Sequence, residues 1–224
     1  MGLDALRQET LAVWPLPETR LEAFEPGPNA AVVDALTAQH SLFIHGPHGS
    51  GKTHLAQALI GEVGGFYLQL NDPALDPEVL EGLESFQLVI LDGFESVMGK
   101  PEWESSLFAF WNACLDSQTR IVCFALKPVG DLPIRLPDLR SRVGQLPHFA
   151  LRPLTETDIA QALSRRARVA DLRLAPEVIE YLLRHHARSI GQLSAMLSQI
   201  EQGALRLQRP VTIPLVKRIL GARN

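Results

Sequence analysis

The feature that most constrains this chain is a glycine-rich segment, GPHGSGKT, at residues 46–53. It matches the pattern G-x-x-x-x-G-K-[ST] in full, follows an apolar run at 41–46 and precedes a helical pattern at 52–63. Glycines let the backbone curl with its N–H groups facing a phosphate, and the following helix directs its positive end at the same group. The segment therefore predicts a phosphate-binding loop between a strand and a helix.

We expect this loop to hold ATP or ADP. The Lys52 side chain supplies a positive charge for the β and γ phosphates, and the Thr53 hydroxyl can bind Mg²⁺. The predicted nucleotide-binding residues are Gly46, Pro47, His48, Gly49, Ser50, Gly51, Lys52, Thr53 and His54.

A second element of the site is predicted at Asp92, which ends the apolar run LVILD at 88–92. A carboxylate at the end of such a strand can bind Mg²⁺ directly or through water, so Asp92 is the predicted metal partner of Thr53. The alternative is a carboxylate that merely caps the strand end.

The pattern of apolar residues indicates an α/β fold with a parallel sheet. Short β-like runs occur at 41–46, 65–70, 87–92 and 120–126. Helical patterns lie between them at 52–63, 77–85 and 102–117. Such alternation is typical of strands joined by helical crossovers.

From Thr155 onward the β signal is weak. Thr155 and Asp158 resemble a capping box that opens a helix to about residue 169, Pro176 starts another helix, and a third helical pattern runs over 190–207. We therefore expect a small all-α domain after the α/β core. Four prolines within residues 1–30 predict an extended or irregular arm before it.

Charge is distributed unevenly along the chain. Residues 1–150 carry 9 Lys and Arg against 19 Asp and Glu, a net of −10, whereas residues 151–224 carry 12 against 6, a net of +6. A basic segment can contact nucleic acid or an acidic protein surface. Alternatively, the arginines lie on solvated faces of amphipathic helices, and both interpretations stay open.

The two cysteines, Cys114 and Cys123, lie in apolar stretches, which favours reduced core thiols and a cytoplasmic location. The N-terminus lacks the pattern of an export signal, and no apolar stretch approaches the roughly 20 residues that cross a bilayer.

Four segments together resemble the DnaA branch of the AAA+ proteins and, within it, the Hda family of regulators. They are GKTHL (51–55), FEPGPN (24–29), LRSRVG (139–144) and TIPLVKRIL (212–220). The resemblance implies an AAA+ P-loop core with a parallel sheet at 20–150, a helical lid at 152–224 and an N-terminal arm at 1–19. It also implies a bacterial cytoplasmic protein.

The resemblance implies two functional elements outside the loop. Arg142 corresponds to an arginine finger that acts on ATP held by DnaA; its alternative role is pairing with Asp138. Gln8, Leu11 and Val13 correspond to a peptide that binds the DNA sliding clamp, although a partial match leaves simple packing of the arm equally open.

Three departures from the family pattern predict weak intrinsic ATPase activity. Gly93 stands where an acid commonly positions the attacking water, and Glu95 lies two residues further on. Leu126 replaces a polar sensor after the fourth strand, and Gly191 replaces the arginine of a second sensor, a role that Arg188 could take.

The resulting hypothesis is a regulator that docks on the sliding clamp and stimulates ATP hydrolysis by DnaA, limiting replication initiation. One alternative is a DNA-binding helicase loader or initiator, although an initiator is expected to continue into a helix-turn-helix domain beyond Asn224. Another is a self-sufficient NTPase or small-molecule kinase. The acidic core and basic lid also suggest head-to-tail packing with DnaA or with another copy.

Overall fold

The computed structural model describes residues 21, 26–169, 172, 174–186, 190–207 and 209–221. The chain divides into two compact units, one up to Arg152 and one from Pro153 onward.

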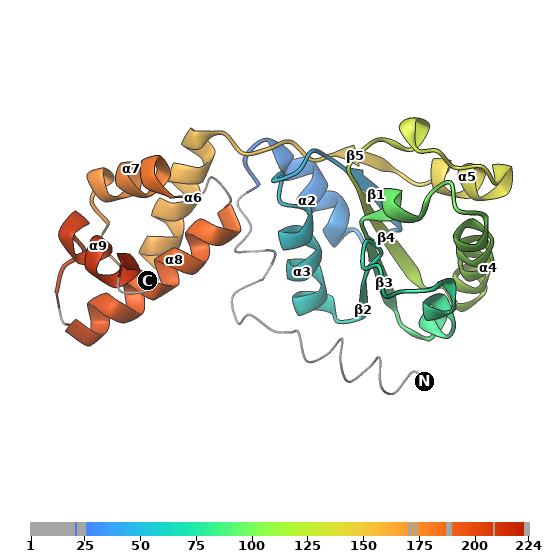
Figure 1. Ribbon diagram of the computed structural model, residues 1–224, viewed down its shortest axis with the longest axis horizontal. Coiled ribbons are helices and arrows are strands. Elements are labelled where there is room, and N and C mark those ends of the chain that lie inside the picture. Colours follow the sequence, from blue (N-terminus) through green and yellow to red (C-terminus); the bar gives the residue numbers. More distant parts are fainter. Residues whose placement is uncertain are drawn as a thin grey trace. The chain divides into compact units, whose positions relative to one another are not determined.

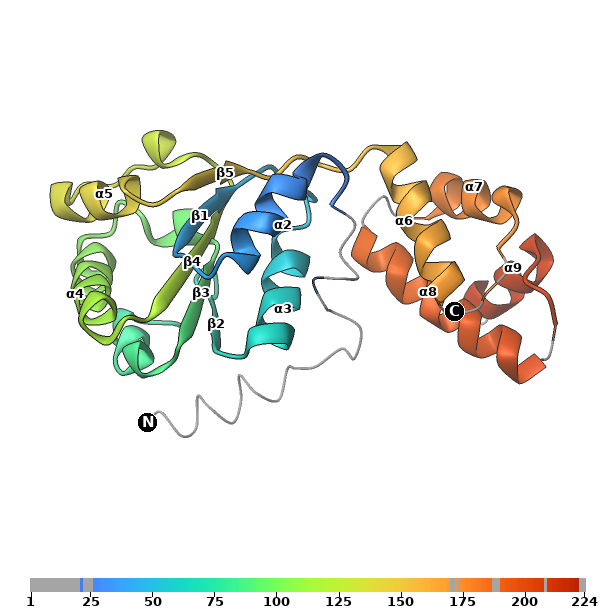
Figure 2. The same ribbon diagram turned by 180° about the vertical axis from the view of Figure 1, so that it is seen from behind.

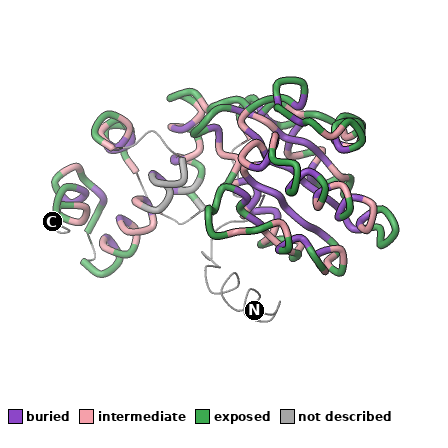
Figure 3. The backbone as a smooth tube through the Cα atoms, turned by 45° about the vertical axis from the view of Figure 1, so that its right-hand side comes forward, coloured by how far each residue is buried: buried purple, intermediate pink, exposed green. Residues whose placement is uncertain are grey.

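The N-terminal unit is built on a five-stranded parallel sheet in the order β2-β3-β4-β1-β5. Its strands are β1 (Leu42–His45), β2 (Phe66–Gln69), β3 (Leu88–Asp92), β4 (Arg120–Ala125) and β5 (His148–Ala150). Every residue of β3 and β4 is buried, because helices cover both faces of the sheet. The predicted α/β fold is confirmed, and Figure 3 shows the buried strands at the centre of the unit.

Helices lie on both faces of this sheet (Figures 1 and 2). They are α2 (Ala30–Thr37) and α3 (Lys52–Val63) on one face, and α4 (Pro101–Ser117) and α5 (Pro137–Gly144) on the other. Successive strand residues point to opposite faces. Ile44 and Ile90 therefore pack in the core beneath α2 and α3, whereas Phe43 and Leu91 pack in the core beneath α4 and α5.

Three elements differ from the sequence predictions. The helix expected at 77–85 is two 3-10 helices, η3 (Pro77–Leu80) and η4 (Leu83–Ser85), separated by Gly82 with a φ of 78°. Helix α2 and strand β5 were not predicted. The three residues of β5 are mostly exposed, so they lack the apolar run that marks a buried strand.

Three further 3-10 helices connect the main elements: η2 (Gly27–Asn29), η5 (Phe94–Val97) and η6 (Val129–Asp131). Of these, η5 directly follows β3 and is preceded by Gly93, which has a left-handed φ of 75°.

The C-terminal unit consists of α6 (Glu156–Val169), α7 (Pro176–His185), α8 (Ile190–Leu207) and α9 (Ile213–Gly221) in its described part. The predicted capping box is confirmed: the Asp158 carboxylate accepts from the N–H of Thr155, and the N–H of Asp158 donates to the Thr155 hydroxyl. Leu163, Leu182 and Leu193 are buried in the core of this unit. Across the described helices of the chain, none has the length and apolar character that a membrane span requires.

Candidate nucleotide-binding site

The predicted phosphate loop connects β1 to α3. Gly46 must be a glycine here, because a Cβ at this position would lie 2.3 Å from the carbonyl oxygen of Leu151. Gly51 precedes the first turn of α3 with a φ of 94°, a conformation that side chains disfavour. The loop therefore presents its backbone at the positive end of α3.

Lys52 folds back over this loop. Its ammonium group donates hydrogen bonds to the carbonyl oxygens of Gly46 (2.7 Å) and Pro47 (2.9 Å). Burial lowers the pKa of Lys52, while the carboxylates of Asp92 and Glu95 act in the opposite direction. The ammonium group thus lies within the electrostatic reach of two acids near the carboxyl end of β3.

The loop contains one polar atom that suits a phosphate. The Oγ atom of Ser50 is buried, and the described part of the chain offers it no hydrogen-bond partner. A buried hydroxyl without a partner costs free energy, which a bound phosphate would recover by accepting its hydrogen bond. The N–H groups in the first turn of a helix also lack partners within the helix. The residues of the loop therefore fit the phosphates of a nucleotide.

Asp92 and Thr53, the predicted Mg²⁺ partners, are brought together by the fold. The Thr53 hydroxyl donates to Oδ2 of Asp92 at 2.9 Å, and Asp92 is only 6% exposed. Among the described residues, no three His, Cys, Asp or Glu side chains form a metal cage. One carboxylate and one hydroxyl suit Mg²⁺, which usually completes its shell with waters and substrate phosphates.

A second side-chain partner of Asp92 was missed by the sequence interpretation. The hydroxyl of Tyr67, on β2, donates to the same Oδ2 atom at 2.8 Å. Burial, followed by the charge of Asp92, raises the pKa of Tyr67 well above its ordinary value, so the phenol remains a donor. No motif signals this contact, because β2 and β3 are separate strands.

The structure also joins Leu126, one of the three departures, to Glu95, the acid that lies two residues after Gly93. Oε2 of Glu95, on η5, accepts a hydrogen bond from the backbone N–H of Leu126 at 3.0 Å. Glu95, the acid two residues after Gly93, is thus hydrogen-bonded to the backbone at the position where a polar sensor would stand. This contact leaves Glu95 poorly suited to orient a water molecule.

Arg142 lies on α5, which packs on the opposite face of the sheet from α3. It belongs to α5, which Leu139 and Val143 anchor in the core shared with α4. Its Nη2 atom donates to Oδ1 of Asn112 on α4 at 3.2 Å, and the side chain is half-buried. Helix α3, which carries Lys52, covers the opposite face (Figure 2).

The remaining predicted residues are placed as follows. Burial lowers the pKa of His54, which lies in the first turn of α3. Gly191 lies in α8. Gln8, Leu11, Val13 and Arg188 lie outside the described residues, as does the start of the 24–29 segment. Its last residue, Asn29, exchanges two hydrogen bonds with the backbone of Arg152, at 2.9 and 2.8 Å.

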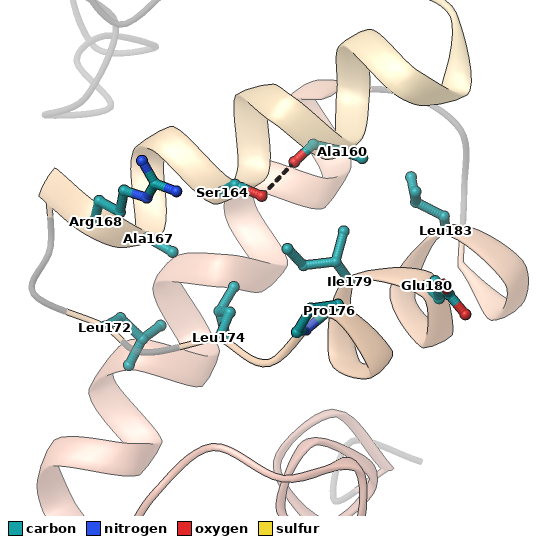
Figure 4. Close-up of a pocket in the computed structure, with 10 residues that line it drawn as sticks. All are labelled: Ala160, Ser164, Ala167, Arg168, Leu172, Leu174, Pro176, Ile179, Glu180 and Leu183. Carbon is teal, nitrogen blue, oxygen red and sulfur yellow. Dashed lines mark hydrogen bonds between the residues drawn. The ribbon is translucent and has the colours of Figure 1, made fainter.

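The C-terminal unit contains a groove of about 600 Å³ between α6 and α7 (Figure 4). Its walls are mainly apolar: Ala160, Ala167, Leu172, Leu174, Pro176, Ile179 and Leu183. Ser164 donates within its own helix to the carbonyl of Ala160, and Arg168 and Glu180 lie toward opposite ends of the groove. Such a wall lacks the converging donors of the phosphate loop, so the loop remains the candidate nucleotide site.

The parallel sheet, the phosphate loop after β1, the acid at the end of β3 and the helical C-terminal unit define a P-loop protein of the AAA+ class. The fold is similar to domain III of the replication initiation protein DnaA of Thermotoga maritima, with a TM-score of 0.66 and 20% identity over 93% of this chain and 98% of that chain. AMPPCP-bound DnaA from Aquifex aeolicus gives a TM-score of 0.66 and 22% identity over 86% of this chain and 68% of that chain. The fold is also similar to the Thermotoga maritima RuvB Holliday junction branch migration motor. That comparison has a TM-score of 0.58 and 16% identity, over 100% of this chain and 70% of that chain.

The C-terminal unit adds the more specific match. Residues 156–220 match the family model described as "Hda, lid domain". The C-terminal unit is therefore similar to the Hda lid domain, and the fold of the chain is similar to that of DnaA. The predicted AAA+ core with a helical lid, and the predicted Hda resemblance, are confirmed.

Proposed function

We propose that this chain binds ATP or ADP with Mg²⁺ and regulates the replication initiator DnaA. The loop residues 46–54 would hold the phosphates, with Lys52 supplying the cation. Thr53 and Asp92 would hold Mg²⁺, which when bound neutralises phosphate charge. The buried Ser50 hydroxyl, which has no partner among the described residues, and the 2.9 Å contact between Thr53 and Asp92 support this part of the proposal. A fold neighbour, DnaA from Aquifex aeolicus, is bound to AMPPCP.

The observation that carries the regulatory role is the position of Arg142. The residue lies on α5, whereas α3, which carries Lys52, packs on the opposite face of the sheet. An arginine so placed serves a nucleotide held by another protein better than one held by its own chain. A guanidinium directed at the transferred phosphoryl group stabilises its charge, an effect worth about 10³ to 10⁵ in rate in other systems.

We propose that the chain's own site acts as a switch that responds to bound nucleotide, and that it hydrolyses ATP only slowly. Gly93 offers no carboxylate to position water, and Glu95 is bonded to the N–H of Leu126. Nucleotide in this site would then stabilise the form of the protein that acts on DnaA.

The remaining parts of the proposal concern location and assembly. We propose that Gln8, Leu11 and Val13 bind the sliding clamp, since glutamine followed by spaced aliphatic residues suits an apolar groove with a polar edge. This would bring Arg142 to DnaA at replicating DNA in the bacterial cytoplasm. We also propose that the chain can form a homo-oligomer through the same α5 face.

The test is single-turnover hydrolysis of ATP bound to DnaA, with clamp loaded on DNA, in the presence of this protein or its Arg142→Ala variant. Arg135→Ala is the matched control, because Arg135 is exposed and precedes the same helix. We expect the wild type and the control to stimulate hydrolysis strongly. With Arg142→Ala, the stimulated rate of hydrolysis should fall by at least about 10³-fold. Absence of stimulation by the wild type would refute the regulatory role and favour the helicase-loader alternative.

A further inference from the structure

Tyr67 occupies a position that the proposed nucleotide chemistry does not yet explain. It lies on β2 and pairs with Ile90 of β3, while Gln69 pairs with Asp92. Residues two apart on a strand share a face, so Tyr67 and Asp92 both face the α3 side of the sheet. Helix α3, which carries Thr53 in its first turn, packs on this side, and the three side chains meet there.

The contacts converge on one carboxylate oxygen. Both the Tyr67 hydroxyl (2.8 Å) and the Thr53 hydroxyl (2.9 Å) donate to Oδ2 of Asp92. One of these donors comes from the phosphate loop's helix and the other from the edge of the sheet beyond β3. Two donors from separate elements restrict the rotation of this carboxylate more than Thr53 alone, which is an exposed residue.

We propose that Tyr67 is a positioning residue for Mg²⁺. It fixes the Asp92 carboxylate in the orientation that binds the metal of a Mg²⁺–nucleotide complex, and it acts through Asp92 rather than by touching nucleotide. The inference rests on the proposed nucleotide binding and adds a residue to that site. Outer-shell groups that orient a metal ligand typically change metal affinity by about 10- to 100-fold when removed.

A structural role is the competing explanation, because the Tyr67 ring also packs against the core beneath α3. Tyr67→Phe separates the two roles, since phenylalanine keeps the ring and removes the hydroxyl. A packing role would leave the Mg²⁺ requirement of nucleotide binding unchanged. A positioning role would raise that requirement and leave metal-free binding as it was.

The experiment titrates Mg²⁺ into the full chain with a fluorescent ADP analogue and repeats the binding in EDTA. Tyr181→Phe is the matched control: Tyr181 is the chain's other tyrosine and stacks on His185 in α7, with ring centroids 4.7 Å apart. We expect Tyr67→Phe to raise the Mg²⁺ concentration at half-saturation by about tenfold, with unchanged affinity in EDTA. Tyr181→Phe should match the wild type.

A double-mutant cycle with Asp92→Asn tests the route of the effect. Once the carboxylate is absent, adding Tyr67→Phe should change the Mg²⁺ requirement no further. The proposal is overturned if Tyr67→Phe leaves that requirement unchanged or lowers it, if it weakens binding equally with Mg²⁺ and EDTA, or if the two substitutions act independently. A wild-type chain that binds no nucleotide in either condition would instead refute the proposed function, and this inference with it.

Discussion

Replacing Glu104 by glutamine should destabilise the N-terminal unit through three backbone groups that share its carboxylate. Glu104 lies on α4, is 1% exposed, and accepts from the N–H of Gly99 at 2.7 Å. It also accepts from the N–H of Arg135 at 2.9 Å and from that of Leu136 at 2.7 Å. The carboxylate thus fastens the segment that leads directly into α5.

The magnitude follows from counting those donors. Glutamine keeps the shape of the side chain, but whichever way the amide is turned its NH₂ group faces an N–H donor. One buried N–H is then left without an acceptor, at a cost of about 1–3 kcal/mol, and the other bonds lose the strength that the charge gave them. We expect the Glu104→Gln variant to lose about 3 kcal/mol of unfolding free energy.

The same carboxylate makes stability depend on pH. Burial acts to raise the pKa of Glu104, but the backbone N–H groups of Arg135, Leu136 and Gly99 outweigh it, so the folded-state pKa lies below the ordinary value of 4.5. The unfolded chain therefore takes up the proton first as the pH falls. The stabilisation is complete above about pH 4.5 and is lost as the pH falls through the folded-state pKa, a loss that Glu104→Gln cannot show.

The assay is urea unfolding followed by tryptophan fluorescence, since Trp103 and Trp111 lie buried on the same helix. Glu102→Gln is the matched control, because Glu102 is exposed in the first turn of α4 and should change stability by less than about 0.5 kcal/mol. Equal stability of the two variants would refute the role assigned to Glu104. If this segment also positions Arg142, Glu104→Gln should weaken the stimulation of DnaA without changing nucleotide affinity.

Other substitutions test separate features of the N-terminal unit by thermal or urea unfolding. Gly65→Ala should lower the free energy of unfolding by about 2–3 kcal/mol, because Gly65 has a φ of 121° and a Cβ there would lie 2.4 Å from a carbonyl oxygen of β3. Gly61→Ala, at an exposed position inside α3, should instead stabilise by about 0.5–1 kcal/mol; equal effects of the two would contradict the argument. Arg120→Met should cost about 2–3 kcal/mol, since the buried guanidinium donates to two backbone carbonyls at the end of α2, and a neutral effect would show that these bonds contribute little. Burial raises the pKa of Cys114 to about 12 and also raises the pKa of Cys123, so at pH 8 both thiols should react with a thiol reagent only on unfolding; fast labelling of the native chain would contradict this.

The sequence predicted the parts of the site that are local in the chain. The loop at 46–53 is encoded by glycine spacing, and Asp92 by the apolar run before it. The capping box at Thr155 spans four residues and was predicted for the same reason. By contrast, the helix expected at 77–85 was wrong, since Gly82 adopts a left-handed conformation that divides it into two short turns.

Some elements could not be predicted because their residues carry a weak local signal. Strand β5 has three residues, mostly exposed, and owes its conformation to pairing with β1. The pairing of Asn29 with the backbone of Arg152 joins residues that are 123 positions apart. Neither contact follows from periodicity, which reports burial along one segment at a time.

The sequence by itself determined the class of fold and the place of the predicted phosphate loop between a strand and a helix, because both depend on short patterns of apolar residues and glycines. Tertiary structure decided which side chains complete the site. The parallel register of β2 and β3 brought the Tyr67 hydroxyl within hydrogen-bond distance of Asp92. The neighbouring ends of β3 and β4 allowed Glu95 to accept a hydrogen bond from Leu126. Packing of helices on both faces of the sheet put the helices of Arg142 and Lys52 on opposite faces. The physical reason is that hydrogen bonds between distant segments depend on register and packing, which are fixed only when the whole sheet assembles.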